Sequence, residues 1–198
     1  IKAWKRWGNT AEQIIKSNPY VLCIQGVDLS FSRADAVAAK SDIPADSECR
    51  IKAGITYILR QNADQGHTCL PLDSLVKTAV SYLDVDEKLI KKVIEDETEE
   101  ENLYYYDKHG RRFVMLADFY KAEDYIARRL AIMRQISYDN KIDFSEVIDL
   151  EEENNGIQYE KIQREAINLA LSKGFLVLTG GPGTGKTTTL NAIISLYQ

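Results

Sequence analysis

The residues of this chain with the clearest chemical potential form one glycine-rich run near its C-terminal end. Positions 180–187 fit the pattern G-x-x-x-x-G-K-[ST], and a further threonine follows at position 188. Glycine adopts left-handed and tightly curved conformations at low cost, so the backbone N–H groups of such a run can turn toward one anion. The helix that follows would add its positive N-terminal end. The run therefore predicts a phosphate-binding loop for a nucleoside triphosphate.

Two side chains in the run have the types that triphosphate chemistry requires. Lys186 would carry a compact positive charge to the terminal phosphates, and Thr187 would give a hydroxyl ligand to the accompanying Mg²⁺. We therefore assign Lys186 and Thr187 as the candidate catalytic residues, with Thr187 as the metal ligand. The residues expected to surround the phosphates are Gly181, Pro182, Gly183, Thr184, Gly185, Lys186, Thr187 and Thr188.

The flanking sequence places this run between a strand and a helix. Residues 175–178 (Phe-Leu-Val-Leu) predict a buried strand, and Thr188 to Tyr197 predict a helix. Without the phosphate-binding function, the same run would be a simple strand-to-helix connection. The motif alone leaves open which class of ATPase or GTPase the chain represents.

A second candidate lies on a helix about twenty residues before the lysine. Gln163 carries an amide that offers a hydrogen-bond donor and an acceptor together, and these match the N6 and N7 edge of adenine. Gln163 is therefore a candidate for selecting ATP. Taken alone, Gln163 is more typical of a solvent-exposed glutamine on a helix.

Composition excludes several classes of protein. Hydrophobic residues make up 44% of the 198 residues, which supports real cores and argues against disorder. No apolar stretch is long enough for a membrane span and no signal-peptide core is present, so we expect a cytoplasmic protein without a membrane partner. The formal net charge of −5 means that a polyanion would have to bind a local basic surface. Three cysteines without C-x-x-C spacing argue against a disulfide framework and a zinc site.

Hydrophobic spacing upstream predicts a mainly α-helical chain. A first helix is expected to begin with a Thr10–Gln13 capping box and to stop at Asn18 before Pro19. Further helices are expected from Arg33 to Lys40, after a turn at Gly26, and from Ser47 to Asn62. Residues 72–83 and 89–94 repeat at helical spacing, and residues 103–106 and 113–116 form a hairpin pattern. A long helix is expected from Asp118 to Ile136, and the acidic stretch 143–156 is expected to be a helix or a linker.

These elements predict a mainly α fold with a small β-hairpin, followed by the start of an α/β P-loop NTPase domain. The expected domains are a helix-hairpin-helix-like domain over 1–65, a winged-helix-like domain over 66–116, a connecting helix and linker over 117–157, and the start of a motor domain over 158–198. Because position 1 is Ile and the chain stops after the phosphate loop, we expect a piece of a longer ATPase.

The order of the motifs resembles that of the RecD-like superfamily 1 DNA helicases, in the branch with a longer N-terminus that acts without RecB and RecC. The resemblance rests on Q-x-x-A at 163–166 ahead of the phosphate loop, together with the segments 18–22, 31–35, 50–55, 66–71 and 122–130. It implies ATP- and Mg²⁺-driven movement, 5′ to 3′, on single-stranded DNA or DNA junctions, in repair or recombination. It also implies that residues 1–8 end an upstream hairpin unit.

One position departs from the pattern of that family. The hairpin at 26–31 lacks the expected second glycine and carries Asp28 where a DNA-gripping hairpin would present backbone N–H groups to phosphate. We therefore expect this hairpin to pack between elements without binding DNA. Other candidate DNA contacts are Lys2, Lys5 and Arg6 among Trp4 and Trp7, and Lys108, Arg111 and Arg112 on the proposed wing.

The sequence thus predicts an ATP-dependent DNA helicase whose N-terminal domains bind DNA or a protein partner. The 198 residues do not contain the second acidic motif of a motor, so by themselves they are expected not to hydrolyse ATP. Two alternatives remain open. One is a non-catalytic module that docks DNA or protein, and the other is a P-loop NTPase of another class, in which Gln163 would have no role.

Overall fold

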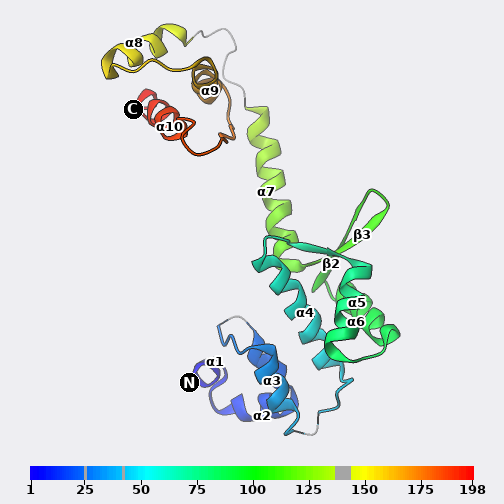
Figure 1. Cartoon of the computed structure of the whole chain (residues 1–198). Helices are drawn as coiled ribbons and strands as arrows, with labels where there is room; N and C mark the ends of the chain where they lie inside the picture. The colour runs from blue at the N-terminus through cyan, green and yellow to red at the C-terminus, as the bar shows by residue number, and fades with distance from the viewer. Residues whose placement is uncertain (25, 42, 137–143) are drawn as a thin grey trace. The chain divides into compact units, whose positions relative to one another are not determined.

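The computed structural model describes residues 1–24, 26–41, 43–136 and 144–198, which form two compact units. The first unit is Ile1–Ala122 and the second is Glu123–Gln198, so the division falls inside helix α7 (Ala117–Gln135). Figure 1 shows helices in both units and strands in the first. The chain is mainly α-helical with one small sheet, as the sequence predicts.

Short helices form the N-terminal part of the first unit. They are α1 (Lys2–Trp7), η1 (Gly8–Thr10), α2 (Ala11–Ser17), η2 (Pro19–Cys23) and α3 (Phe31–Ala38). Helix α2 ends just before Pro19, as predicted, but the predicted capping box is wrong, because the Thr10 hydroxyl donates to the carbonyl oxygen of Trp7 at 2.7 Å. Helix α3 begins at Phe31 behind Ser30, two residues before the predicted start at Arg33.

The turn between η2 and α3 is closed by its own aspartate. Gly26 has a φ of +93° and Asp28 a φ of +58°. The backbone N–H of Gly26 donates to Asp28 Oδ1 at 3.0 Å, and Lys2 Nζ lies 3.0 Å from Asp28 Oδ2. The Asp28 carboxylate therefore accepts from this turn and neutralises a nearby lysine.

Three longer helices carry most of the core of the first unit. They are α4 (Glu48–Asp64), α5 (Leu72–Leu83) and α6 (Glu87–Glu99), and their apolar stripes meet at side chains such as Ile51, Ile55 and Ile90. Gly54 permits the close approach of α4 to α5, because a Cβ at this position would lie 2.6 Å from a methyl carbon of Leu83. Gly66, with a φ of +90°, follows the end of α4 as predicted.

Arg50 joins three segments of this unit. Its guanidinium contacts both carboxylate oxygens of Asp35 on α3, at 2.8 and 3.2 Å, and donates to the carbonyl oxygens of Ala45 and Leu83. The Tyr20 hydroxyl donates to the same carboxylate. The hydrogen bond from Arg50 lowers the pKa of Asp35, whereas burial raises the pKa of Tyr20. One half-buried ion pair thus connects α3 to α4 and to the end of α5.

The acidic run 95–101 at the end of α6 is only partly solvated. Glu97 is buried, and its Oε1 lies 2.8 Å from Lys52 Nζ on α4. Glu100 also lies within ion-pair distance of Lys52. The run therefore helps to hold α6 against α4.

The sheet has three antiparallel strands in the order β1-β3-β2, namely β1 (Cys69–Pro71), β2 (Leu103–Lys108) and β3 (Arg111–Leu116). The hairpin β2–β3 was predicted, and its turn has positive φ values at His109 (50°) and Gly110 (73°), as the tight hairpin turns that match strand twist require. Strand β1 was not predicted, because three residues are too few to show an alternating pattern. With α5 and α6 the sheet completes the helix, helix, hairpin order of a winged helix.

The second unit contains most of α7 and the helices α8 (Ser145–Asn155), α9 (Lys161–Ser172) and α10 (Lys186–Leu196). Its small core is formed by Ile148, Tyr159, Ile167 and Ala192. The stretch predicted as helix or linker is thus a helix ending at Gly156, which has a φ of +61°. Residues 137–143 of the predicted connecting segment lie outside the described residues.

The predicted buried strand at 175–178 is not formed. Among the residues that the structure describes, this segment pairs with no other strand, and Phe175, Val177 and Leu178 are exposed. A strand needs a neighbour to accept and donate its ladder of backbone hydrogen bonds. The prediction of a buried strand at 175–178 is therefore wrong.

Candidate nucleotide-binding site

The glycine-rich run forms a loop that leads directly into α10. Gly183 and Gly185 have φ values of +77° and +76°, which side chains other than glycine rarely adopt. Helix α10 begins at Lys186, two residues before its predicted start at Thr188, so Lys186, Thr187 and Thr188 lie in its first turn. Backbone N–H groups in the first turn of a helix have no partner within the helix, and they are the groups that bind anions.

Lys186 folds back over the loop that precedes it. Its Nζ donates to the carbonyl oxygen of Gly180 at 2.6 Å and also to that of Gly181. The hydroxyl of Thr184 donates to the same Gly181 oxygen at 2.9 Å. The loop is therefore curled around the ammonium group of Lys186.

The threonines after the lysine differ in exposure. Thr187, the candidate magnesium ligand, is exposed, whereas Thr188 is half-buried. Thr189 is buried, and its hydroxyl donates to the carbonyl oxygen of Gly185 at 3.1 Å. Thr189 thus stabilises the start of α10, a role that the motif did not reveal.

Gln163 contacts the phosphate loop, although 22 residues separate it from Gly185 along the chain. Its Oε1 accepts the backbone N–H of Glu160 at 2.9 Å, and its Nε2 lies 3.4 Å from the carbonyl oxygen of Gly185. With Glu160 it forms a capping box at the start of α9. The structure therefore brings Gln163 to the loop and uses both ends of its amide.

Gly185 is enclosed by this contact. A Cβ built on Gly185 would lie 2.2 Å from Gln163 Nε2, a distance that no real side chain could keep. A Cβ on Gly181 would lie 3.9 Å from its nearest neighbour, a methyl group of Thr184. Gly185 is thus required both by its backbone conformation and by the lack of space for a side chain. At Gly181, a Cβ would have space.

Helix α8 supplies a set of acidic contacts to α9. Glu152 accepts the backbone N–H of Tyr159 and a guanidinium N–H of Arg164, both at 2.7 Å. Arg164 also lies 2.5 Å from Asp149, and these hydrogen bonds raise the pKa of Arg164. Sequence patterns did not reveal this network, because the acidic stretch looked like a linker and no local spacing connects Glu152 to Arg164.

The arrangement has the donors that a magnesium triphosphate requires. It offers first-turn backbone N–H groups, the ammonium group of Lys186 and the exposed hydroxyl of Thr187, all within a few residues of one another. Gln163 brings an amide to the edge of the same loop. The residues present therefore fit ATP with Mg²⁺.

The candidate DNA-contact residues lie in the first unit. Lys2, Trp4, Lys5 and Arg6 are exposed or nearly so on α1, and Trp7 is half-buried. At the hairpin, Arg112 pairs with Asp107 at 3.1 Å and stacks its guanidinium over Tyr105, 4.8 Å from the ring centre. Lys108 and Arg111 are cross-strand neighbours, and no described acidic side chain forms an ion pair with either.

Metal-binding groups, cysteines and membrane-spanning helices were searched for in the described ranges. Within them, no group of His, Cys, Asp and Glu has the arrangement of a metal site, and the three cysteines are free and half-buried. None of the described helices combines the length and apolar character needed to cross a membrane.

The loop, the helix after it and the nearby glutamine have the arrangement of a P-loop nucleotide-binding site, and comparison with known proteins agrees with this class. Residues 163–198 match the family described as an AAA domain, and residues 1–69 match the HHH domain of the ATP-dependent RecD2 DNA helicases. The chain is thus RecD-like, as its motif order predicts.

Individual relatives agree with this assignment. The chain is 62% identical over 34 residues to the RecBCD enzyme subunit RecD of two Mycobacterium tuberculosis strains, CDC 1551 and H37Rv, and to that of Mycolicibacterium smegmatis. The matched segment is 17% of this chain and 6% of each relative. The similarity to these proteins therefore concerns a small part of their length.

Proposed function

We propose that this chain carries the nucleotide-binding loop and N-terminal domains of an ATP-dependent DNA helicase that moves 5′ to 3′ and acts in repair or recombination. The observation that carries the proposal is the contact of Gln163 with the phosphate loop at Gly185. A glutamine that lies beside a phosphate loop can read the base of the nucleotide whose phosphates the loop holds. The cytoplasmic location that we expect would give the protein access to DNA.

Each candidate residue has a defined task in this proposal. Backbone N–H groups from Gly183 to Thr188 would surround the phosphates, and Lys186 would neutralise charge on the β- and γ-phosphates. Thr187 would hold Mg²⁺, and the ion would supply positive charge beside the phosphates. The amide oxygen of Gln163 would accept a hydrogen bond from the N6 amino group of adenine, and its amide nitrogen would donate one to N7.

The contacts of Lys186 indicate what must change when a nucleotide binds. Its ammonium group donates to two loop carbonyl oxygens, and phosphate oxygens would replace these as acceptors. A phosphate oxygen carries negative charge and attracts the ammonium group more strongly than a neutral carbonyl oxygen does. Binding of the triphosphate would therefore draw the lysine away from the loop and open it.

The DNA strand would meet the first unit at the basic hairpin. Lys108 and Arg111 face each other across the two strands, an arrangement that is destabilising for like charges. A polyanion bound between them would remove this repulsion. By contrast, the carboxylate of Asp28 makes the turn at 26–28 a poor phosphate contact, so we assign that turn to packing.

Unwinding by the full-length gene product tests this function. Partial duplexes with a 5′ or a 3′ single-stranded tail are mixed with the protein, ATP and Mg²⁺, and strand separation is followed by fluorescence. We expect separation of the 5′-tailed duplex and none with Lys186→Ala. Unwinding of the 3′-tailed duplex alone would contradict the direction, whereas binding of DNA without unwinding by the wild-type protein would favour a docking module.

A further inference from the structure

The side chain of Glu152 connects α8 to the start of α9. It is only 16% exposed, and both of its oxygens are occupied: Oε1 accepts the N–H of Tyr159 and Oε2 accepts Arg164 Nη1, each at 2.7 Å. The carbonyl oxygen of the same residue accepts the N–H of Ile157 at 3.1 Å. One residue of α8 thus contacts two residues of the segment that leads into α9 and one residue of α9 itself.

The hydrogen bonds of Glu152 are of the strong kind. A carboxylate that accepts from a guanidinium and from a backbone N–H forms charge-assisted bonds, which are shorter and stronger than neutral ones. Limited exposure reduces competition from water. Arg164 gains a second acidic partner in Asp149, and the ring of Tyr159 is buried in the core of the unit. The first turn of α9 is therefore held by Tyr159 before it and by Arg164 at its end.

Gln163 lies between these fixed points. Tyr159 precedes the capping residue Glu160, and Arg164 follows Gln163 directly and donates its backbone N–H to the Glu160 carbonyl oxygen at 2.9 Å. Glu160 and Gln163 then bond each other reciprocally, which leaves the Nε2 of Gln163 directed at Gly185. The position of the Gln163 amide follows from the position of the turn that Glu152 holds.

We propose that Glu152 is a positioning residue for adenine recognition, which makes α8 part of the nucleotide site. Through Tyr159 and Arg164 it holds Gln163 beside the phosphate loop. This inference rests on the proposed function, because it takes Gln163 to be the residue that reads adenine. Residue 152 lies outside both segments that match known families, 1–69 and 163–198.

Calorimetric titration of the 198-residue chain in Mg²⁺ tests the proposal with three probes: ATP, GTP and tripolyphosphate. Tripolyphosphate contacts the loop but has no base, so it reports on the loop alone. We expect Glu152→Ala and Gln163→Ala each to weaken ATP binding about tenfold, the value of one good hydrogen-bonded contact. Both should leave tripolyphosphate affinity within about twofold of the wild-type value.

A double variant and a matched control sharpen the test. If Glu152 acts through Gln163, the double variant Glu152→Ala/Gln163→Ala binds ATP no more weakly than Gln163→Ala alone. Glu153→Ala removes the same charge from an exposed neighbour on α8 and should bind ATP like the wild type. Additive losses in the double variant, or wild-type ATP affinity in Glu152→Ala, would overturn the inference.

A milder substitution guards against loss of folding. Glu152→Gln keeps a carbonyl oxygen for the Tyr159 N–H but removes the charge opposite Arg164. Circular dichroism and urea unfolding establish that it is folded, and we expect its preference for ATP over GTP to fall about threefold. A folded Glu152→Gln variant with the wild-type ATP preference would contradict the inference. Absence of ATP binding by the wild-type chain would instead contradict the proposed function itself.

Discussion

The lysine of the phosphate loop donates to carbonyl oxygens of its own loop, so nucleotide binding has to compete with an internal contact. The same loop uses glycine where a side chain would be strained or would collide, and Gly185 meets both conditions. The motif could be predicted at this scale because its residues are contiguous. The capping box of Glu160 with Gln163 has local spacing but was not predicted, because glutamate is not among the preferred N-cap residues. The contacts of Glu152 could not be predicted, because folding alone brings its partners to it.

Gly185→Ala should destabilise the second unit by about 1–3 kcal/mol, the usual cost of forcing a side chain into a left-handed backbone conformation. The new methyl group would also displace Gln163. Urea unfolding, followed by circular dichroism, measures the loss. Gly181→Ala is the matched control, because its Cβ has space and its φ is not in the left-handed region, and it should change stability little. Equal stability of the two variants would count against the described loop.

At the scale of elements, the helices of the first unit were predictable from their apolar spacing, and the errors have local causes. Strand β1 is too short to show a pattern, and the segment 175–178 was expected to pair but has no partner among the described residues. The ion pair of Arg50 with Asp35 was also not predicted. It connects α3 to α4 and stabilises the fold of the first unit.

Arg50→Ala should lower the free energy of unfolding of the first unit by about 2–4 kcal/mol, because it leaves a half-buried carboxylate without its partner. The carbonyl oxygens of Ala45 and Leu83 would lose a donor as well. Arg60→Ala on the same helix removes an exposed ion pair with Asp118 and should cost less than about 1 kcal/mol. Urea unfolding of both variants measures the two losses of unfolding free energy. Losses of similar size would contradict this account of Arg50.

The same ion pair predicts a dependence on pH. The pKa of Asp35 is lowered from its ordinary value of 3.8 by the hydrogen bond from Arg50. Its contribution to stability is therefore complete above that value and is lost as the pH falls through the lower pKa of the folded state. The stability difference between the wild type and Asp35→Asn should be full at neutral pH and shrink in strong acid. A difference that is independent of pH would contradict the described contact.

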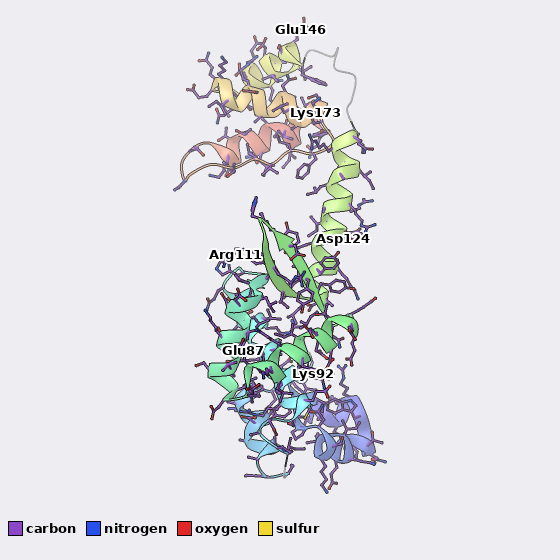
Figure 2. All side chains as sticks on the ribbon, turned by 90° about the vertical axis from the view of Figure 1, so that its right-hand side faces the viewer. Glu87, Lys92, Arg111, Asp124, Glu146 and Lys173 are labelled. Carbon is purple, nitrogen blue, oxygen red and sulfur yellow. The ribbon has the colours of Figure 1, made fainter. Side chains whose placement is uncertain are left out.

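At the scale of the whole molecule, the net charge of −5 means that any nucleic acid must be held by a local basic surface. Figure 1 shows the hairpin β2–β3 extending away from α5 and α6, and Figure 2 marks Arg111, the first residue of β3. The basic residues along the sequence indicated this hairpin as a candidate DNA contact. They could not show that Arg112 is neutralised by Asp107 while Lys108 and Arg111 are not.

Arg111→Glu should weaken DNA binding and reduce the slope of log affinity against log salt by about 1, as expected for one lost phosphate contact. Fluorescence anisotropy with a labelled single strand at several salt concentrations measures both quantities. Lys91→Glu makes the same change of charge sign on α6, where Lys91 pairs with Glu87, and should leave the slope unchanged. Equal effects of the two variants would indicate a general charge effect and no contact at the hairpin.

The most direct test of the central claim is calorimetric titration of ATP into this chain with and without Mg²⁺. The account predicts binding that requires Mg²⁺ and is lost in Lys186→Ala, while a control at the exposed lysine of α9, Lys161→Ala, leaves it intact. If the wild-type chain shows no Mg²⁺-dependent affinity for ATP, or if Lys186→Ala binds ATP as the wild type does, the loop at 180–188 is not the nucleotide site.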